Sequence, residues 1–138
     1  LLYITAATLA APAPSATIFS LSMSFSTCFT PDEELLCACD LGIDQIKLYE
    51  FNHRTGKLKL FDIIRSQQES APRKMIFSED GKYAYVVCEL KNYINVYSYD
   101  KDSDKTRFEM IQNIFTVRRD HKSNSAASDI LHQLDLIG

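Results

Sequence analysis

The chain has 138 residues, with 15 Lys and Arg against 18 Asp and Glu, and a formal net charge of −3 at pH 7. This balance gives no electrostatic reason to expect a nucleic acid or an anionic membrane as a partner. Hydrophobic residues make up 46% of the chain, which excludes wholesale disorder and allows a packed core.

Residues 1–28 differ in composition from the rest, because they contain no charged side chain and are rich in Ala, Ser, Leu and Pro. The run at 9–16 has the small residues of a signal-peptide cleavage region, but neither an initiator Met nor a basic segment precedes it. Pro12 and Pro14 cut the apolar run far below the ~20 residues that cross a bilayer. We therefore expect an atypical leader outside the repeat and no membrane segment, with secretion as the alternative to a cytoplasmic protein.

From Phe29 onward, apolar and polar residues alternate with a period of two between polar turns, which is typical of short β-strands. The pattern predicts strands at 35–39, 45–51 and 57–64, and then at 75–78, 83–88, 93–99 and 108–115. The second group repeats the first: Phe29 aligns with Phe77 and Asp32 with Asp80 at a constant offset.

Four antiparallel strands in about 40 to 45 residues are typical of one β-propeller blade. The sequence thus predicts an all-β fold of propeller blades at 29–70 and 71–117, with an incomplete blade at 118–138. Because two and a half blades cannot close a ring, we expect self-association through exposed blade edges. The change of composition at both ends favours a truncated or frame-disturbed copy of a longer sequence.

The four cysteines form no C-x-x-C pair, and no histidine lies at metal-site spacing from them. Cys37 and Cys39 alternate along one strand, so both face the same way. We expect small buried strand residues rather than metal ligands or a redox pair, and a cytoplasmic location is the default expectation.

Several motifs occur together within residues 25–130. They are Phe29-Thr-Pro-Asp, Cys39-Asp-Leu-Gly-Ile-Asp-Gln-Ile, Thr55-Gly-Lys-Leu, Ala71-Pro-Arg-Lys, Phe77-Ser-Glu-Asp-Gly-Lys-Tyr-Ala-Tyr-Val and Glu89-Leu. In combination they resemble the lactonase family, which comprises seven-bladed propeller 6-phosphogluconolactonases and the related cis,cis-muconate cyclases. The resemblance implies a fragment of a seven-bladed propeller.

In that family, a Pro-Arg-His element before an inner strand and the acidic residue of an Asn-Glu-Leu element belong to the active site. The resemblance assigns these catalytic positions to Arg73 and Glu89. Both are expected at the same end of the blade, because Arg73 precedes the inner strand and Glu89 follows the next, antiparallel strand. A guanidinium there could bind an anion or an oxyanion, and a carboxylate could activate water. An ordinary loop ion pair is the alternative.

Two further residues are candidates for substrate binding. Lys74 stands where the family has the histidine of Pro-Arg-His, and Asp40 occupies the place in the first blade that Glu89 has in the second. A turn-capping side chain is the alternative for Asp40.

The chain also departs from the family pattern. Phe25 stands where the family has a histidine, and the Ser/Glu-Ile-His element is displaced to Asp129-Ile-Leu-His132. The missing imidazole would be the best proton-transfer group near neutral pH.

The resemblance implies hydrolysis of a sugar lactone, with 6-phosphogluconolactone of the pentose phosphate pathway as the expected substrate. The alternatives are an inactive propeller fragment that serves as a binding or scaffold module, and a muconate-type cyclase that forms a lactone. A small-molecule lactone is the expected partner, and no metal or organic cofactor is indicated.

Overall fold

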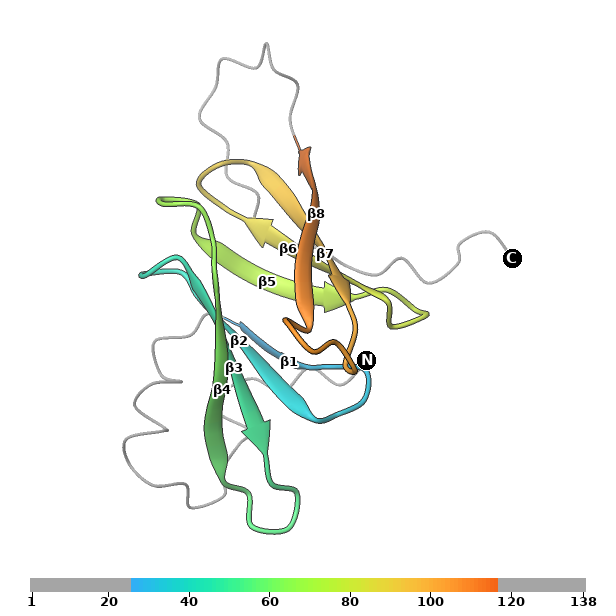
Figure 1. Ribbon diagram of the computed structural model, residues 1–138. Coiled ribbons are helices and arrows are strands. Elements are labelled where there is room, and N and C mark those ends of the chain that lie inside the picture. The colour runs from blue at the N-terminus through green and yellow to red at the C-terminus, as the bar shows by residue number, and fades with distance from the viewer. Residues whose placement is uncertain (1–25, 117–138) are drawn as a thin grey trace, which may run out of the picture.

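The computed structural model describes residues 26–116, and this part of the chain contains eight strands and no helix. The strands are β1 (Ser26–Phe29), β2 (Leu35–Asp40), β3 (Gln45–Phe51), β4 (Leu58–Arg65), β5 (Pro72–Phe77), β6 (Tyr83–Cys88), β7 (Tyr93–Tyr99) and β8 (Phe108–Phe115). They form two antiparallel sheets with the orders β1-β2-β3-β4 and β5-β6-β7-β8 (Figure 1). The antiparallel four-stranded blades predicted from the sequence are confirmed.

The sequence repeat is also a repeat of local geometry. In the first blade the Leu35 N–H donates to Oγ1 of Thr30 at 3.0 Å, and in the second the Tyr83 N–H donates to Oγ of Ser78 at 3.0 Å. Each third strand pairs with the fourth through a register shift, between Leu48 and Tyr49 and between residues 96 and 97. Equivalent residues therefore build equivalent turns and bulges in both blades.

The inner strands β1 and β5 differ most from the predicted ranges. Strand β1 takes in Ser26, Thr27 and Cys28, which the sequence pattern leaves in the leader, because it pairs with β2 from Ser26 opposite Cys39. Strand β5 begins at Pro72 rather than Met75, because Pro72 is already opposite Cys88 on β6. The residues of β1 and β5, STCF and PRKMIF, do not alternate between apolar and polar, so the period-two pattern does not mark these inner strands.

The core lies between the two blades. Strand β2 is buried along its whole length, and its side chains alternate between a cluster shared with the second blade and a smaller cluster on the other face. Cys37 and Cys39 belong to the shared cluster, which confirms that they are small buried strand residues on one face. The shared cluster comprises Leu35, Cys37, Cys39, Ile46, Leu48, Met75, Phe77, Ala84, Val86, Cys88, Tyr93, Tyr97 and Phe108.

Polar contacts join the blades at one edge, where β1 and β3 end and the loop between β7 and β8 begins. The hydroxyl of Tyr99 donates to Oδ2 of Asp32 at 2.6 Å, and Nη1 of Arg107 donates to Oε2 of Glu34 at 2.8 Å. The inner strands β1 and β5 lie beside each other (Figure 1). The two blades are therefore held by a buried core and by polar contacts at this edge, which we call the tie edge.

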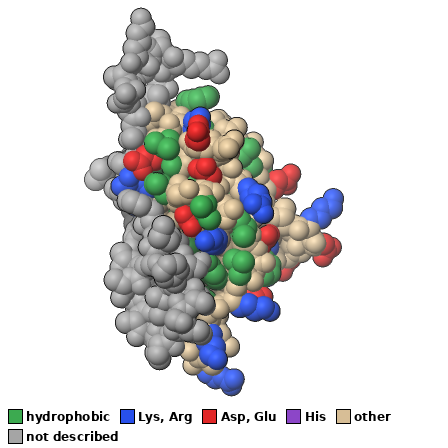
Figure 2. Space-filling model, turned by 90° about the vertical axis from the view of Figure 1, so that its left-hand side faces the viewer, with side chains coloured by type: hydrophobic (Ala, Val, Ile, Leu, Met, Phe, Trp, Pro, Cys, Tyr) green, Lys and Arg blue, Asp and Glu red, His purple; other side chains and the backbone are tan. Residues whose placement is uncertain are grey.

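The outer surface mixes charged and apolar side chains, as the face in Figure 2 shows. Large hydrophobic residues are exposed on β8, among them Met110, Ile111, Ile114 and Phe115. Residues 26–116 contain no helix that could span a membrane.

Candidate functional site

Arg73 lies at an irregularity of strand β5. Pro72 is opposite Cys88 and Lys74 is opposite Val87, so Arg73 is the extra residue of a β-bulge. It therefore lies within β5, and not before it as the sequence pattern predicts. Bulges locally bend a strand and change the direction in which a side chain points.

The guanidinium of Arg73 meets the carboxylate of Glu89. Nη1 donates to Oε2 at 2.6 Å, and the side chains are 25% and 22% exposed. Glu89 directly follows β6, and its N–H donates to the carbonyl of Ala71 at 3.0 Å. The two residues singled out from the sequence are thus in contact at the edge opposite the tie edge, which we call the site edge.

This pair remains accessible to solvent while its geometry is fixed. A partly exposed ion pair contributes little to stability, so its main consequence is the placement of opposite charges at a defined point. A guanidinium has five N–H donors in a rigid plane, and its geometry suits carboxylate and phosphate oxygens. The arrangement can therefore hold an anion beside a carboxylate.

Asp40 lies at the site edge of the first blade, at the end of β2. Its Oδ1 accepts from the Gly42 N–H at 3.2 Å and its Oδ2 accepts from Nζ of Lys47 at 3.3 Å. The side chain is only 5% exposed. Asp40 thus has the contacts of the turn-capping alternative, and its role in substrate binding stays a prediction.

Lys74, the fourth candidate, is half-buried on β5 opposite Val87. It follows Arg73 directly in the chain, and its role as a substrate ligand likewise stays a prediction.

Sequence reasoning missed Asp44, which lies in the turn between β2 and β3. Its carboxylate accepts from the N–H groups of Glu69 and Ala71 at 2.7 and 2.8 Å. These residues belong to the segment that leads into Arg73. The sequence signal, an Asp in a short Gly-containing turn, does not reveal a partner 25 or more residues away.

The described histidine is remote from this pair. His53, in the hairpin between β3 and β4 at the tie edge, stacks on Phe29 and meets Phe51 edge-on. Its ring also contacts the carbonyl of Glu33 at 3.0 Å. Phe25, His121 and His132 lie outside the described residues. His53 is therefore not placed to transfer a proton beside Arg73.

The cysteine thiols are poor candidates for nucleophiles. Burial raises the pKa of Cys88 to about 11, with a further contribution from the charge of Asp44. Burial also raises the pKa of Cys39. Both remain protonated near neutral pH. Within residues 26–116, no group of His, Cys, Asp and Glu side chains has the arrangement of a metal site.

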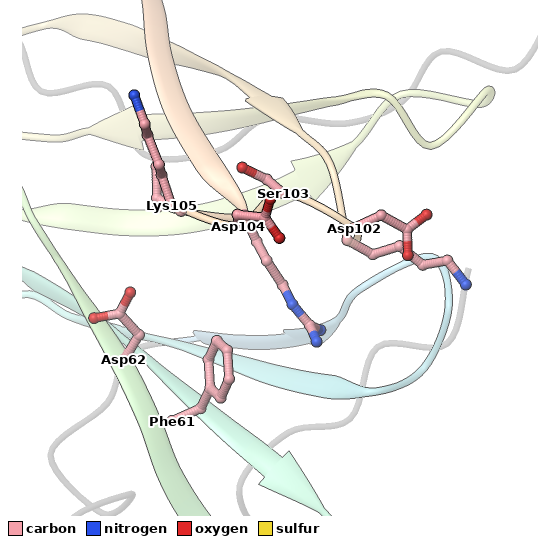
Figure 3. A pocket seen from close by; sticks show the side chains of 9 residues that line it. Phe61, Asp62, Asp102, Ser103, Asp104 and Lys105 are labelled. Atoms are coloured by element: carbon pink, nitrogen blue, oxygen red, sulfur yellow. The ribbon is translucent and has the colours of Figure 1, made fainter.

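A pocket of about 250 Å³ lies away from Arg73 and Glu89, between β4 and the loop that joins β7 to β8 (Figure 3). Phe61 and Asp62 of β4 face the loop residues Asp102 and Lys105 across it. The Arg107 guanidinium stacks over the Phe61 ring at 4.9 Å. Three acidic and three basic residues line the pocket, so it favours no particular ligand charge.

Comparison with known proteins identifies the chain's relatives. The family model described as "Lactonase, 7-bladed beta-propeller" matches residues 22–135. The chain is 33% identical over 102 residues to a 6-phosphogluconolactonase of Bacillus subtilis. The aligned stretch covers 74% of this chain and 28% of that protein. It is 38% identical over 100 residues to an uncharacterized protein of Lactococcus lactis, covering 72% of this chain and 28% of the relative.

Solved structures agree with the fold. A putative 6-phosphogluconolactonase from Bacteroides uniformis has a TM-score of 0.58 at 29% identity, over 64% of this chain and 25% of that one. A periplasmic gluconolactonase from Pseudomonas aeruginosa has a TM-score of 0.66 at 24% identity. The match covers 75% of this chain and 29% of that one. The chain spans less than a third of the length of each relative named here. On the match of the family model, the chain belongs to the lactonase family of seven-bladed β-propellers.

Proposed function

We propose that this chain carries part of the active site of a sugar lactonase, with Arg73 and Glu89 as its catalytic pair. The observation that carries the proposal is the 2.6 Å contact between these side chains at the bulge of β5. Membership of the lactonase family and the similarity to a 6-phosphogluconolactonase of B. subtilis support it.

The chemistry follows from the two charges. Water adds to the carbonyl carbon of the lactone while the Glu89 carboxylate takes one of its protons, and the C–O bond of the ring then breaks. The ring oxygen leaves with the proton that Glu89 returns, so a hydroxy acid is the product. Arg73 holds the negative charge on the carbonyl oxygen in the transition state, or binds an anionic group of the substrate.

We propose 6-phosphogluconolactone as the substrate, within the pentose phosphate pathway. A phosphate or carboxylate would bind to the planar donors of Arg73, and the ammonium group of Lys74 on the same strand would add a second positive charge. Asp40 would contribute only if a substrate displaced Lys47 from its carboxylate, because that ion pair buries it.

The rival function is a binding module without turnover, and two observations favour it. The Arg73 and Glu89 charges already neutralise each other, while the imidazole of His53 lies at the tie edge. Such a module would bind a sugar acid through Arg73 and release it unchanged.

The Glu89→Gln variant distinguishes the two functions. Loss of a general base lowers turnover by about 10²-fold or more, so hydrolysis of 6-phosphogluconolactone should fall by this factor while the far-ultraviolet circular dichroism stays unchanged. Glu79→Gln, in the exposed turn between β5 and β6, is the matched control. Equal turnover in wild type and Glu89→Gln would refute the catalytic role of Glu89.

We also propose a cytoplasmic location. Cys28, Cys37, Cys39 and Cys88 are free thiols, although Cys28 and Cys37 are direct cross-strand neighbours. Free neighbouring thiols are typical of reducing compartments. Fractionation of cells that express the chain would test the location. Fluorescent labelling of the cysteine thiols in the unfolded chain would test whether they are free.

A further inference from the structure

The segment between β4 and β5 has an unusual backbone. Glu69 and Ala71 have left-handed φ values of 59° and 53°, although neither is glycine, and Ser70 between them is fully buried. A residue with a Cβ avoids this conformation unless its surroundings impose it. Something outside the segment therefore holds it in place.

Asp44 supplies these contacts from the first blade. Its Oδ2 accepts from the Glu69 N–H at 2.7 Å and its Oδ1 accepts from the Ala71 N–H at 2.8 Å. Its carbonyl oxygen also accepts from the Ser66 N–H at 2.9 Å. One residue thus holds the segment at its beginning and at its end.

The same segment holds the residue that follows β6. The carbonyl of Ala71 accepts from the Glu89 N–H at 3.0 Å, and the carbonyl of Ser70 accepts from the Leu90 N–H at 3.2 Å. Ala71 therefore binds Asp44 through its N–H and Glu89 through its carbonyl. It also lies two residues before Arg73, at the start of the bulge.

We propose that Asp44 is a positioning residue, which sets the distance between Arg73 and Glu89 through the backbone of Ala71. Its connection to activity rests on the proposed lactonase function, whereas its effect on the backbone does not. The catalytic pair of the second blade is then fixed by a side chain of the first blade, so the site depends on how the two blades pack together.

A carboxylate suits this position because both of its oxygens accept a backbone N–H. In Asp44→Asn one oxygen is replaced by an NH₂ group, which is a donor and would face another donor. Asp44→Asn therefore loses one of the two hydrogen bonds at nearly constant side-chain volume. Asp44→Glu keeps two acceptor oxygens on a longer side chain. It should therefore retain part of the backbone hydrogen bonding that Asp44→Asn loses.

Hydrogen exchange followed by mass spectrometry tests the backbone effect without relying on activity. In Asp44→Asn, we expect the peptides covering 66–72 and 87–91 to exchange at least ten times faster than in wild type. A peptide from β3 should keep its wild-type rate, and Asp44→Glu should lie between the two. Asp80→Asn is the matched control, since Asp80 also accepts a backbone N–H, from Lys82 at 3.0 Å, but at the tie edge.

Lactone hydrolysis completes the test. We expect Asp44→Asn to lower kcat by about 10²-fold, since a displacement of about 1 Å at a catalytic pair has this effect, while Asp80→Asn keeps its turnover. Unchanged exchange at 66–72 and 87–91, or equal acceleration in β3, would overturn the proposal. Full turnover in Asp44→Asn would overturn its role in the reaction. An inactive wild type with the selective exchange change would instead count against the lactonase function alone.

Discussion

Glu33 and Gly81 occupy equivalent positions in the turns of the two blades, and both have left-handed φ values, of 60° and 71°. Glycine adopts this conformation without steric cost, whereas a glutamate does not. The turn of the second blade therefore has the residue type that its backbone favours, Gly81, whereas Glu33 in the first blade is strained.

The first prediction follows from this difference. Glu33→Gly should raise the free energy of unfolding by about 0.5–1 kcal/mol, because the steric relief exceeds the extra entropy of glycine in the unfolded chain. Gly81→Ala should lower it by about 1–3 kcal/mol, since a Cβ there would lie 3.0 Å from Cβ of Pro31. Urea unfolding measures both, and a destabilising Glu33→Gly would contradict the account of the turn.

The second prediction concerns the contact between Tyr99 and Asp32. Burial raises the pKa of Asp32, but hydrogen bonds from Thr30, Tyr99 and the Glu34 N–H outweigh it, so the pKa is lowered. A lowered carboxyl pKa stabilises the fold above pH ~4, and this stability is lost as the pH falls further. Tyr99→Phe should lower the free energy of unfolding at pH 7 by about 1–2 kcal/mol.

Tyr99→Phe should also make the loss of stability between pH 5 and pH 2 less steep, because Asp32 then gains less from being ionised. Tyr83→Phe, an exposed tyrosine of β6, is the control and should keep the wild-type pH dependence. Unfolding followed at several acidic pH values gives the comparison. An equally steep loss in Tyr99→Phe would show that the hydroxyl does not stabilise the ionised carboxyl.

The third prediction is self-association of the 138-residue chain at micromolar concentration. Strand β8 is an edge strand with exposed apolar side chains, and such edges promote pairing with other chains. The double variant Met110→Lys/Ile114→Lys should shift sedimentation toward the monomer. Glu109→Lys reverses one charge on the same strand without removing an apolar group, so it should associate like wild type. A monomeric wild type would contradict this prediction.

The repeat made the blades predictable, because equivalent turns and half-buried strands recur with the same residue types in both copies. The inner strands were harder, since Ser26 and Pro72 begin strands whose residues carry no period-two pattern. Arg73 and Glu89 were found through the family motif and through the expectation that antiparallel neighbours meet at one edge. The sequence did not predict the bulge at Arg73 or the position of this residue within β5, and both are visible only in the structure.

Asp44 illustrates what local sequence could not reveal. Its two hydrogen bonds reach Glu69 and Ala71 in the segment before the second blade, so they depend on how the blades pack. The left-handed backbone of these residues has no glycine to signal it. The connection from Asp44 to Glu89 is a property of the tertiary fold.

The most direct test of the central claim is hydrolysis of 6-phosphogluconolactone by the wild-type chain, measured as acid release above the spontaneous background. We predict release that disappears in Arg73→Ala and persists in Arg54→Ala, which removes an exposed arginine from the hairpin at the tie edge. Equal release by wild type and Arg73→Ala, or no release from a wild-type chain with β-rich circular dichroism, would contradict the claim that Arg73 and Glu89 form a lactonase site.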